Sequence, residues 1–556
     1  MAELIALEER SNAHQAATTE EPPPPIDQNE SVAGIKFILL TLSIIFSIFL
    51  SALDSTIIST AIPSITAEFG NLNDVVWYSS AYSLTNFAFL SSWGKAYKYF
   101  PLKTSFLLAG VIFEIGNIVC ATAASSTAVV VGRAISGMGG AGIMSGAFII
   151  IAVTAKPQYR AAYMGIVGVT FGCSGVVGPL LGGVLTDRAS WRWCFWYSPC
   201  HLLDQLSKTN ERRISLPIWA TGATGILFSL RTATANSEFT SASIREKIFQ
   251  MDFTGSLLAT GSMVCFITAM HWGGVTKPWS STAVIGCLVA SAVLAGLFIV
   301  NERLMGSRAM VQGRLLLNYT FVANLIYVFF LAGLYFPLLY SLPIQFQSID
   351  NVSASQSGVR LIPLILGISI FTMISNALLS MYRNKHLPLT MLGAVVGTIG
   401  VGLIYSIDDA TASTKKWIGY EIVTAIGVGL ALQLPMIANQ ALVVSDDIPE
   451  ATALTLFFEN MGTTVFNAAT EAAFTSSVIS SLKGVDAAAV IAAGASQLRK
   501  LFSGQELQEV LSSYLDGCRV SHALSLTCGG IATAVSLMMA VPVVKEYFLR
   551  RKSRVL

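Results

Sequence analysis

The stretch FILLTLSIIFSIFLSALDSTIISTAIPS (residues 37–64) decides the fold class of this chain. Its apolar part is long enough to cross a lipid bilayer as an α-helix. The run contains one carboxylate, Asp54, although a charge at the bilayer centre costs roughly 2.5–3.5 kcal/mol on insertion scales. Its position alone leaves two interpretations open. Asp54 is either solvated or capping the backbone at the helix mouth, or it is a buried residue with a functional task.

The composition extends the membrane interpretation to the whole chain. Hydrophobic residues make up 53% of the 556 residues and charged residues only 12%, about half the charged fraction of a soluble protein. Apolar runs of about 20 residues recur along the chain, as transmembrane helices require. Barrel strands of about ten alternating residues do not fit this pattern. We therefore predict an all-α polytopic membrane protein.

Several other classes of function are not indicated. The net charge is +2 and there is no basic tract, so a nucleic-acid partner is not expected. The eight cysteines are scattered without a metal-binding spacing. The sequence carries no Ser/His/Asp set, nucleotide-binding loop or metal cluster. It therefore predicts neither an enzyme nor a protein that needs a cofactor or metal.

Fourteen membrane spans are predicted from the apolar runs and their flanks. They cover approximately residues 36–58, 75–93, 104–124, 127–154, 160–185, 214–231, 252–271, 282–301, 319–341, 357–380, 388–406, 416–440, 452–478 and 523–544. Residues 1–35 are polar, acidic and proline-rich, which predicts a disordered tail.

Lysine and arginine in the short loops predict the orientation of the chain. With fourteen spans, the basic loops and the basic C-terminal segment all lie on the side of the N-terminus, so both termini are predicted to be cytosolic. The opposite side would carry Asn351-Val-Ser353, a predicted glycosylation site. Residues 186–213 are an exception, because they should lie outside yet hold five basic residues.

The fourth and fifth spans carry the most distinctive patterns. The fourth, VVVGRAISGMGGAGIMSG (129–146), is rich in glycine, which permits close helix contact. It also holds Arg133, which either needs a buried carboxylate, carbonyl or water partner or snorkels to the membrane surface. The fifth, GIVGVTFGCSGVVGPLLGGVLTD (165–187), places several glycines on one face, and Pro179 adds a kink. Such a face suits packing against a partner helix and rocking on it.

Taken in order, these motifs resemble those of the major facilitator superfamily, in its fourteen-span drug:proton antiporter branch, and within it the fungal toxin and multidrug efflux pumps. The matching residues are Leu53, Asp54, Thr56, Ile57, Ala61 and Pro63, then Gly132, Arg133 and Gly137, then Gly175, Gly178, Pro179, Gly182 and Gly183, and finally SGVRLIP (357–363). The resemblance associates the fourth-helix arginine with proton coupling and the fifth-helix motif with export.

Two stretches depart from the family pattern. In WGKAYKYFPLK (93–103), Gly94 and Lys103 fit the family's gating loop, but Lys98 stands where an aspartate is expected. Later, YSPCHLLDQLSKTNERRIS (197–215) interrupts a connection that is short in the family. Our hypothesis for this insert is a gene-model error such as an unspliced intron, and the alternative is a genuine outer loop. Sequencing the transcript distinguishes the two.

The resemblance implies the major facilitator fold, with two six-helix halves and two central helices. The corresponding segments are a disordered cytosolic tail (1–35), the N-terminal half (36–231), the central helices (252–301), the C-terminal half (319–544) and a basic cytosolic tail (545–556). Substrate would bind at the midplane between the halves.

The predicted function is export of lipophilic small molecules in exchange for protons, by a monomer in the plasma membrane or the vacuolar membrane. Asp54 and Arg133 are predicted to couple protons, and Asn86, Gln433 and Gln440 to line the substrate cavity. Two alternatives stay open at this stage. The chain could import or facilitate passage of a nutrient or siderophore, or it could be a membrane protein that does not transport.

Overall fold

The computed structural model describes residues 35–69, 75–196, 226, 244–381, 386–407, 414–495 and 497–552. Throughout these residues the regular elements are helices and no strand is present, which confirms the predicted all-α fold. The predicted tail up to residue 34, the insert at 197–215 and almost all of the predicted sixth span (214–231) lie outside the described residues.

The other thirteen predicted spans correspond to helices. These are α2 (Ile35–Phe69), α3 (Val75–Tyr99), α4 (Leu102–Ala121), α5 (Ser126–Thr154), α6 (Pro157–Arg188), α10 (Phe253–Trp272), α11 (Thr282–Met305), α13 (Tyr319–Tyr335) with α14 (Leu338–Ser348), α15 (Ala354–Arg360) with α16 (Ile362–Met381), α17 (His386–Tyr405), α18 (Thr414–Ala431) with α19 (Leu434–Ala441), α20 (Ile448–Ser481) and α23 (Gly504–Lys552). Within the described residues, 11 helical stretches are long and apolar enough to cross a membrane.

Short helices join the long ones. They are α7 (Trp193–Trp196), α9 (Ile244–Phe249), η3 (Gly306–Arg308), α12 (Gly313–Leu316), η4 (Ser445–Asp447), α21 (Ala487–Ala493) and α22 (Leu498–Leu501). Most of them lie in the connections between membrane spans, where they position polar side chains.

The first and last membrane helices are longer than their apolar runs predict. α2 continues past residue 58 to Phe69, and α23 begins at Gly504 rather than near residue 523. Ala61 and Ile65 of α2 and Val510 of α23 are fully buried. Helix packing therefore extends these helices beyond the predicted apolar runs, because tertiary contacts stabilise a helix end as well as apolar length. α23 also continues into the predicted tail at 545–556.

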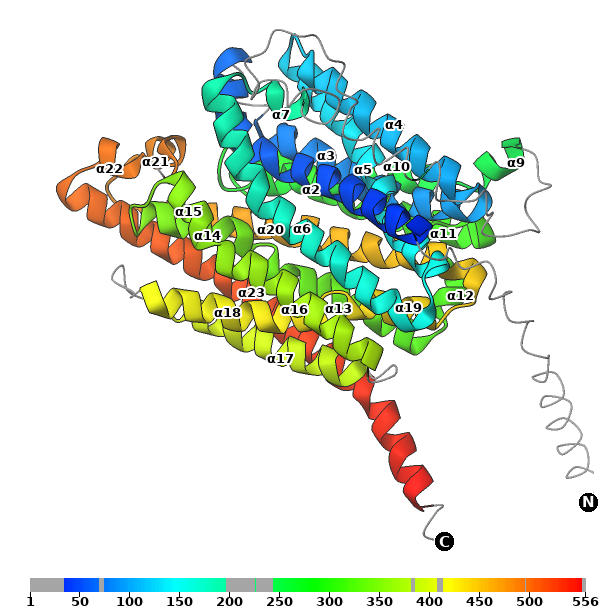
Figure 1. Ribbon diagram of the computed structural model, residues 1–556. Helices are drawn as coiled ribbons and strands as arrows, with labels where there is room; N and C mark the ends of the chain where they lie inside the picture. Colours follow the sequence, from blue (N-terminus) through cyan, green and yellow to red (C-terminus); the bar gives the residue numbers. More distant parts are fainter. Residues whose placement is uncertain are drawn as a thin grey trace, which may run out of the picture.

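The helices form two bundles side by side (Figure 1). In the first bundle, α5 packs against α3 and α4, and α2 packs against α6. In the second, α17 packs against α18 and α23, while α13 packs against α20 and α23. The bundles meet where α6 contacts α16 and where α3 contacts α20. The central pair, α10 and α11, is attached through contacts of α10 with α3 and α20.

The molecule has two distinct ends. We call the end at which α2 begins and α23 finishes the terminal end, and Figure 1 shows α9 and α12 there. The opposite end, which we call the distal end, carries α7, α15, α21 and α22. This common location of the first and last described helix ends agrees with an even number of spans.

Candidate functional site

Asp54 of α2 and Arg133 of α5 form an ion pair inside the first bundle. Arg133 Nη1 lies 2.5 Å from Asp54 Oδ2, and the two side chains are 1% and 0% exposed respectively. Arg133 Nε donates a hydrogen bond to the Tyr78 carbonyl at 3.1 Å, and its Cζ lies 4.5 Å from the centre of the Tyr82 ring. Asp54 is therefore neither solvated nor a cap, and Arg133 does not snorkel.

The ion pair occupies only one of the two carboxylate oxygens of Asp54. Asp54 Oδ1 has no hydrogen-bond partner in the part of the chain that the structure describes. Burial favours the neutral form of a carboxyl group, whereas a nearby guanidinium favours the ionised form. A movement that separated Arg133 from Asp54 would thus favour proton uptake, and their return would favour release. A role of the pair in proton coupling stays a prediction.

Glycines in α5 bring the three helices of this site together. A Cβ atom added to Gly137 would lie 2.3 Å from the Tyr82 carbonyl oxygen, and one added to Gly140 would lie 2.4 Å from the Tyr82 hydroxyl. Side chains at these positions would push α5 away from α3. The predicted role of the glycines in close helix contact is therefore confirmed, and it holds Arg133 against both α2 and α3.

The predicted antiporter motif in α6 packs mostly on α2 of the same bundle. A Cβ atom added to Gly178 or Gly182 would lie 2.0 Å from Thr56 Oγ1 or 2.2 Å from Thr60 Oγ1. Pro179 lies inside the helix between them. This part of α6 is therefore attached to the helix that carries Asp54.

The preceding turns of α6 face the other bundle. Added Cβ atoms at Gly168, Gly172 and Gly175 would meet Gln433 Nε2 at 3.0 Å, Ser369 Oγ at 1.7 Å and Ile365 Cγ2 at 3.6 Å. The smooth face that contacts a partner bundle thus comes mainly from glycines before the motif, and Gly175 is the motif residue at the boundary.

Gly182 and Gly183 offer a matched test of this packing. Replacement of Gly182 by alanine places a Cβ atom 2.8 Å from the Ile57 carbonyl oxygen, so backbone must move and we expect a loss of about 1–3 kcal/mol. Gly183 has nothing within 4 Å of an added Cβ among the described residues, so Gly183→Ala should not lower stability and gains the better helix propensity of alanine. Thermal unfolding of the purified protein in detergent measures both, and equal effects would contradict the assignment.

Lys98 at the end of α3 joins the two bundles at the terminal end. Its Nζ lies 3.0 Å from Asp447 Oδ1 and 2.9 Å from Glu450 Oε2, and all three side chains are at most 8% exposed. Arg314 of α12 contacts the same two carboxylates at 2.6 and 3.3 Å. We call Lys98, Asp447, Glu450 and Arg314 the latch. The basic residue at position 98 is therefore matched by acidic residues at the start of α20.

Of the two predicted gating residues, Gly94 lies beside the latch. An added Cβ atom at Gly94 would lie 2.3 Å from Ala453 Cβ, so this glycine permits the close approach of α3 and α20. Lys103 lies half-buried in the first turn of α4. Gly94 thus serves the contact between the bundles directly.

The two central helices are connected to the latch through the chain that follows α11. Lys95 Nζ donates hydrogen bonds to the carbonyls of Gln250 and Arg308, and Ser91 Oγ donates to the Met310 carbonyl at 3.0 Å. Gln312 Nε2 donates to Glu450 Oε1. Breaking the latch contacts would therefore affect the packing of the central pair as well as of both bundles.

Comparison with known proteins identifies the family. A family model described as Major Facilitator Superfamily matches residues 44–200. The MFS-type transporter GME11371 of Pestalotiopsis microspora is 39% identical over 520 residues, which cover 92% of each chain. The chain belongs to the Major Facilitator Superfamily. This transporter is accordingly a multi-pass membrane protein and not an enzyme.

Two further comparisons agree with this assignment. The probable efflux pump gsfJ of Penicillium aethiopicum is 37% identical over 507 residues, covering 90% of this transporter and 87% of the relative. The crystal structure of the human organic anion transporter MFSD10 (TETRAN) superposes with a TM-score of 0.55 at 12% identity, covering 91% of this chain and 100% of that one. The second comparison supports the fold alone.

The three predicted cavity residues of the transporter lie in different surroundings. Asn86 of α3 is half-buried and next to Phe87. Gln433 accepts a hydrogen bond from Asn376 at 2.7 Å and lies at the contact with α6. Gln440 donates to Thr452 Oγ1 at 2.8 Å inside the second bundle. A role in binding substrate stays a prediction for all three.

Asn351, the predicted glycosylation site, lies in the connection between α14 and α15 of the transporter. It is exposed and has a positive φ of 54°, a conformation that asparagine tolerates better than most residues. Exposure is compatible with modification, which stays a prediction.

Glu68 near the end of α2 was not singled out by the sequence. It lies 2.9 Å from Arg192 and accepts a hydrogen bond from Trp191 Nε1 at 2.7 Å. Hydrogen bonds from Arg192, which contributes most, and from Trp191 hold the pKa of Glu68 below its usual range. This pairing neutralises one of the basic residues that broke the loop-charge rule in 186–213.

The Asp447 carboxylate of the latch should stay ionised near neutral pH. Burial by itself would raise the pKa of Asp447, but hydrogen bonds from Lys98 and Arg314 outweigh it and hold this pKa below the usual value. A lowered carboxyl pKa contributes stability above about pH 4, and this contribution is lost as the pH falls through the lowered pKa. The Tm difference between wild type and Asp447→Asn should therefore be constant from about pH 5 to 8 and shrink below about pH 4. A difference that varies between pH 5 and 8 would contradict this.

Proposed function

We propose that this transporter exports lipophilic small molecules in exchange for protons, by alternating access between its two bundles. The observation that carries the proposal is the buried pair of Asp54 and Arg133, since a carboxylate held by a guanidinium inside a membrane helix bundle can bind and release a proton. The names of relatives, including a probable efflux pump, support export as the direction.

The proton gradient can supply enough free energy for this exchange. One proton that enters across about 100 mV yields about 2.3 kcal/mol. A pH difference of about two units adds roughly 2.7 kcal/mol. At one proton per substrate, the sum of about 5 kcal/mol supports a gradient of several thousandfold for a neutral compound. A single titrating carboxylate is therefore sufficient in principle.

The arrangement of the helices supports alternating access. The latch holds the bundles together at the terminal end through Lys98, Asp447 and Glu450. We infer that this end is cytosolic, from the basic residues in its loops. In this arrangement the latch would close the cytosolic side while protons reach Asp54 from the distal side, and opening of the latch would admit substrate.

Aromatic side chains between the helices suit lipophilic compounds. The Phe87 ring of α3 stacks on Phe457 of α20 at 4.5 Å between ring centres, directly at the contact of the bundles. Phe329, Phe330 and Phe466 form a second group, half-buried, with ring centres 5.1–5.7 Å apart. We infer a substrate with substantial apolar surface, carried by a monomer in the plasma membrane or the vacuolar membrane.

Transport by purified protein in liposomes tests the proposal. With an acidic lumen, the molecules whose distal end faces the lumen should release luminal protons outward and accumulate a neutral lipophilic dye inside. A protonophore should abolish the accumulation. Dye movement in the same direction as the protons would indicate import, and dye movement that does not respond to the gradient would overturn the antiport.

A further inference from the structure

A second buried carboxylate lies near the distal end, in the second bundle. Glu421 of α18 is 1% exposed, and neither of its carboxylate oxygens has a hydrogen-bond partner among the described residues. The Leu364 N–H at the start of α16 is directed at the carboxylate without completing a hydrogen bond. An ionised carboxylate in this position would be costly without a partner, so the group needs a ligand.

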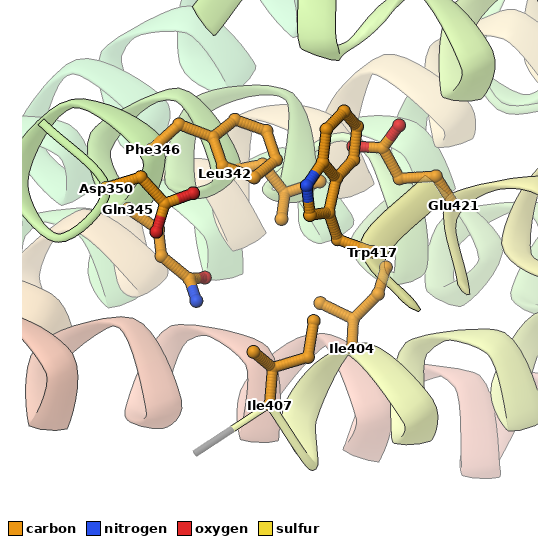
Figure 2. Close-up of a pocket in the computed structure, with 8 residues that line it drawn as sticks. All are labelled: Leu342, Gln345, Phe346, Asp350, Ile404, Ile407, Trp417 and Glu421. Atoms are coloured by element: carbon orange, nitrogen blue, oxygen red, sulfur yellow. The ribbon is translucent and has the colours of Figure 1, made fainter. Parts of the chain in front are cut away.

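Glu421 lines a small cavity (Figure 2). Gln345 and Asp350 form one wall of it and Trp417 and Glu421 another, with the remaining lining apolar. The cavity has room for about one water molecule. It is too small for a lipophilic substrate. Gln345 is buried, and its side-chain oxygen also has no hydrogen-bond partner among the described residues.

Among the described residues, the cation that interacts with Glu421 is Arg360, and it is already paired. Arg360, from the SGVRLIP motif, forms an ion pair with Asp350. Its guanidinium carbon lies 5.3 Å from the centre of the Phe346 ring and 5.2 Å from that of Trp417. α16, which packs against α18, contains no titratable residue, and α17 with its following turn contributes only isoleucines to the cavity. Glu421 is thus left without a counter-ion of its own.

We propose that Glu421 is a second proton-binding site, which holds a proton while Arg360 stays paired with Asp350. A buried carboxyl group without a cation partner is more stable in its neutral form. When Arg360 moves from Asp350 to Glu421, the O–H bond of Glu421 breaks, its proton passes to water in the cavity, and the carboxylate gains the guanidinium as its partner. Use of this site in transport rests on the proposed antiport, whereas the protonation itself does not.

Infrared difference spectroscopy of the full-length purified transporter tests protonation directly and without transport. Between neutral and alkaline pH, the wild type should lose a protonated-carboxyl band. Glu421→Gln should remove the Glu421 component of this change, and Glu506→Gln, which alters an exposed carboxylate in the first turn of α23, should leave that component in place. A wild-type spectrum without the band, or an unchanged band in Glu421→Gln, overturns the proposal.

A second variant separates a proton site from a merely structural carboxyl group. Asp350→Asn frees Arg360 to pair with Glu421, so the Glu421 band should titrate at lower pH or vanish at neutral pH. A carboxyl group that only packs against the start of α16 would titrate as in the wild type, which would overturn the proposal. A band that appears only when sodium is removed would assign the site to sodium and overturn it as well. The band with its Asp350→Asn shift, found without any pH-driven transport, would support the proton site and contradict the antiport.

Discussion

Replacement of Asp54 by asparagine should abolish export driven by a pH gradient while leaving the protein in the membrane. Asparagine has nearly the same shape as aspartate and still accepts a hydrogen bond from Arg133, but it cannot take up a proton. Export and proton flux should both fall to the level of empty liposomes. The measurement is dye accumulation under an imposed pH gradient, with insertion checked by surface labelling of the purified protein.

The loss of one charge also has a cost in stability, and this cost can be separated from the loss of coupling. Asp54→Asn leaves the Arg133 guanidinium buried without its counter-ion, which destabilises by about 3–5 kcal/mol. The double variant Asp54→Asn with Arg133→Gln removes both charges, so it should regain most of the stability and none of the export. Undiminished export by correctly inserted Asp54→Asn would exclude Asp54 as the proton carrier.

Restoring the family's aspartate at position 98 should damage this transporter. Lys98→Asp places a third carboxylate beside Asp447 and Glu450, both of which are nearly fully buried. Removing one partner of a buried pair costs about 3–5 kcal/mol, because the remaining charge is left uncompensated. The terminal end should therefore open, with faster hydrogen exchange at the start of α20 and a lower Tm.

The exchange of charges provides the control for the latch. Lys98→Asp combined with Asp447→Lys restores opposite charges across the contact and should recover part of the protection and the Tm. Arg303→Asp reverses the charge of an exposed residue in the last turn of α11 and should change neither. If Lys98→Asp exchanges at the wild-type rate, the latch does not hold the bundles together.

Some of the site was predictable from sequence and some was not, and two carboxylates show the difference. Asp54 drew attention because it interrupts an apolar run and belongs to a recognisable motif. Glu421 interrupts the run WIGYEIVTAIG in the same way and was missed, although the expense of a carboxylate inside a membrane helix applies equally to it. The signal in the sequence is the same for both residues: a carboxylate inside an apolar run.

Sequence alone was enough to predict an all-α membrane protein that resembles the Major Facilitator Superfamily, with a candidate carboxylate and arginine in its N-terminal half. Apolar length, glycine spacing and proline position are local properties, and the bilayer and the backbone act on them locally. Such properties predict where helices lie and which residues in them are out of place. They do not determine which residues of different helices contact one another in the folded protein.

The pairing of the charged residues became visible only in the folded structure. Asp54 and Arg133 are 79 positions apart and Lys98 and Glu450 are 352 apart, so their pairing depends on how helices pack and not on either local sequence. The same holds for Arg360, which could face Asp350 or Glu421 and is paired with Asp350. An ion pair inside a membrane protein depends on the distance between its partners and on their burial, and both arise only when the helices pack together.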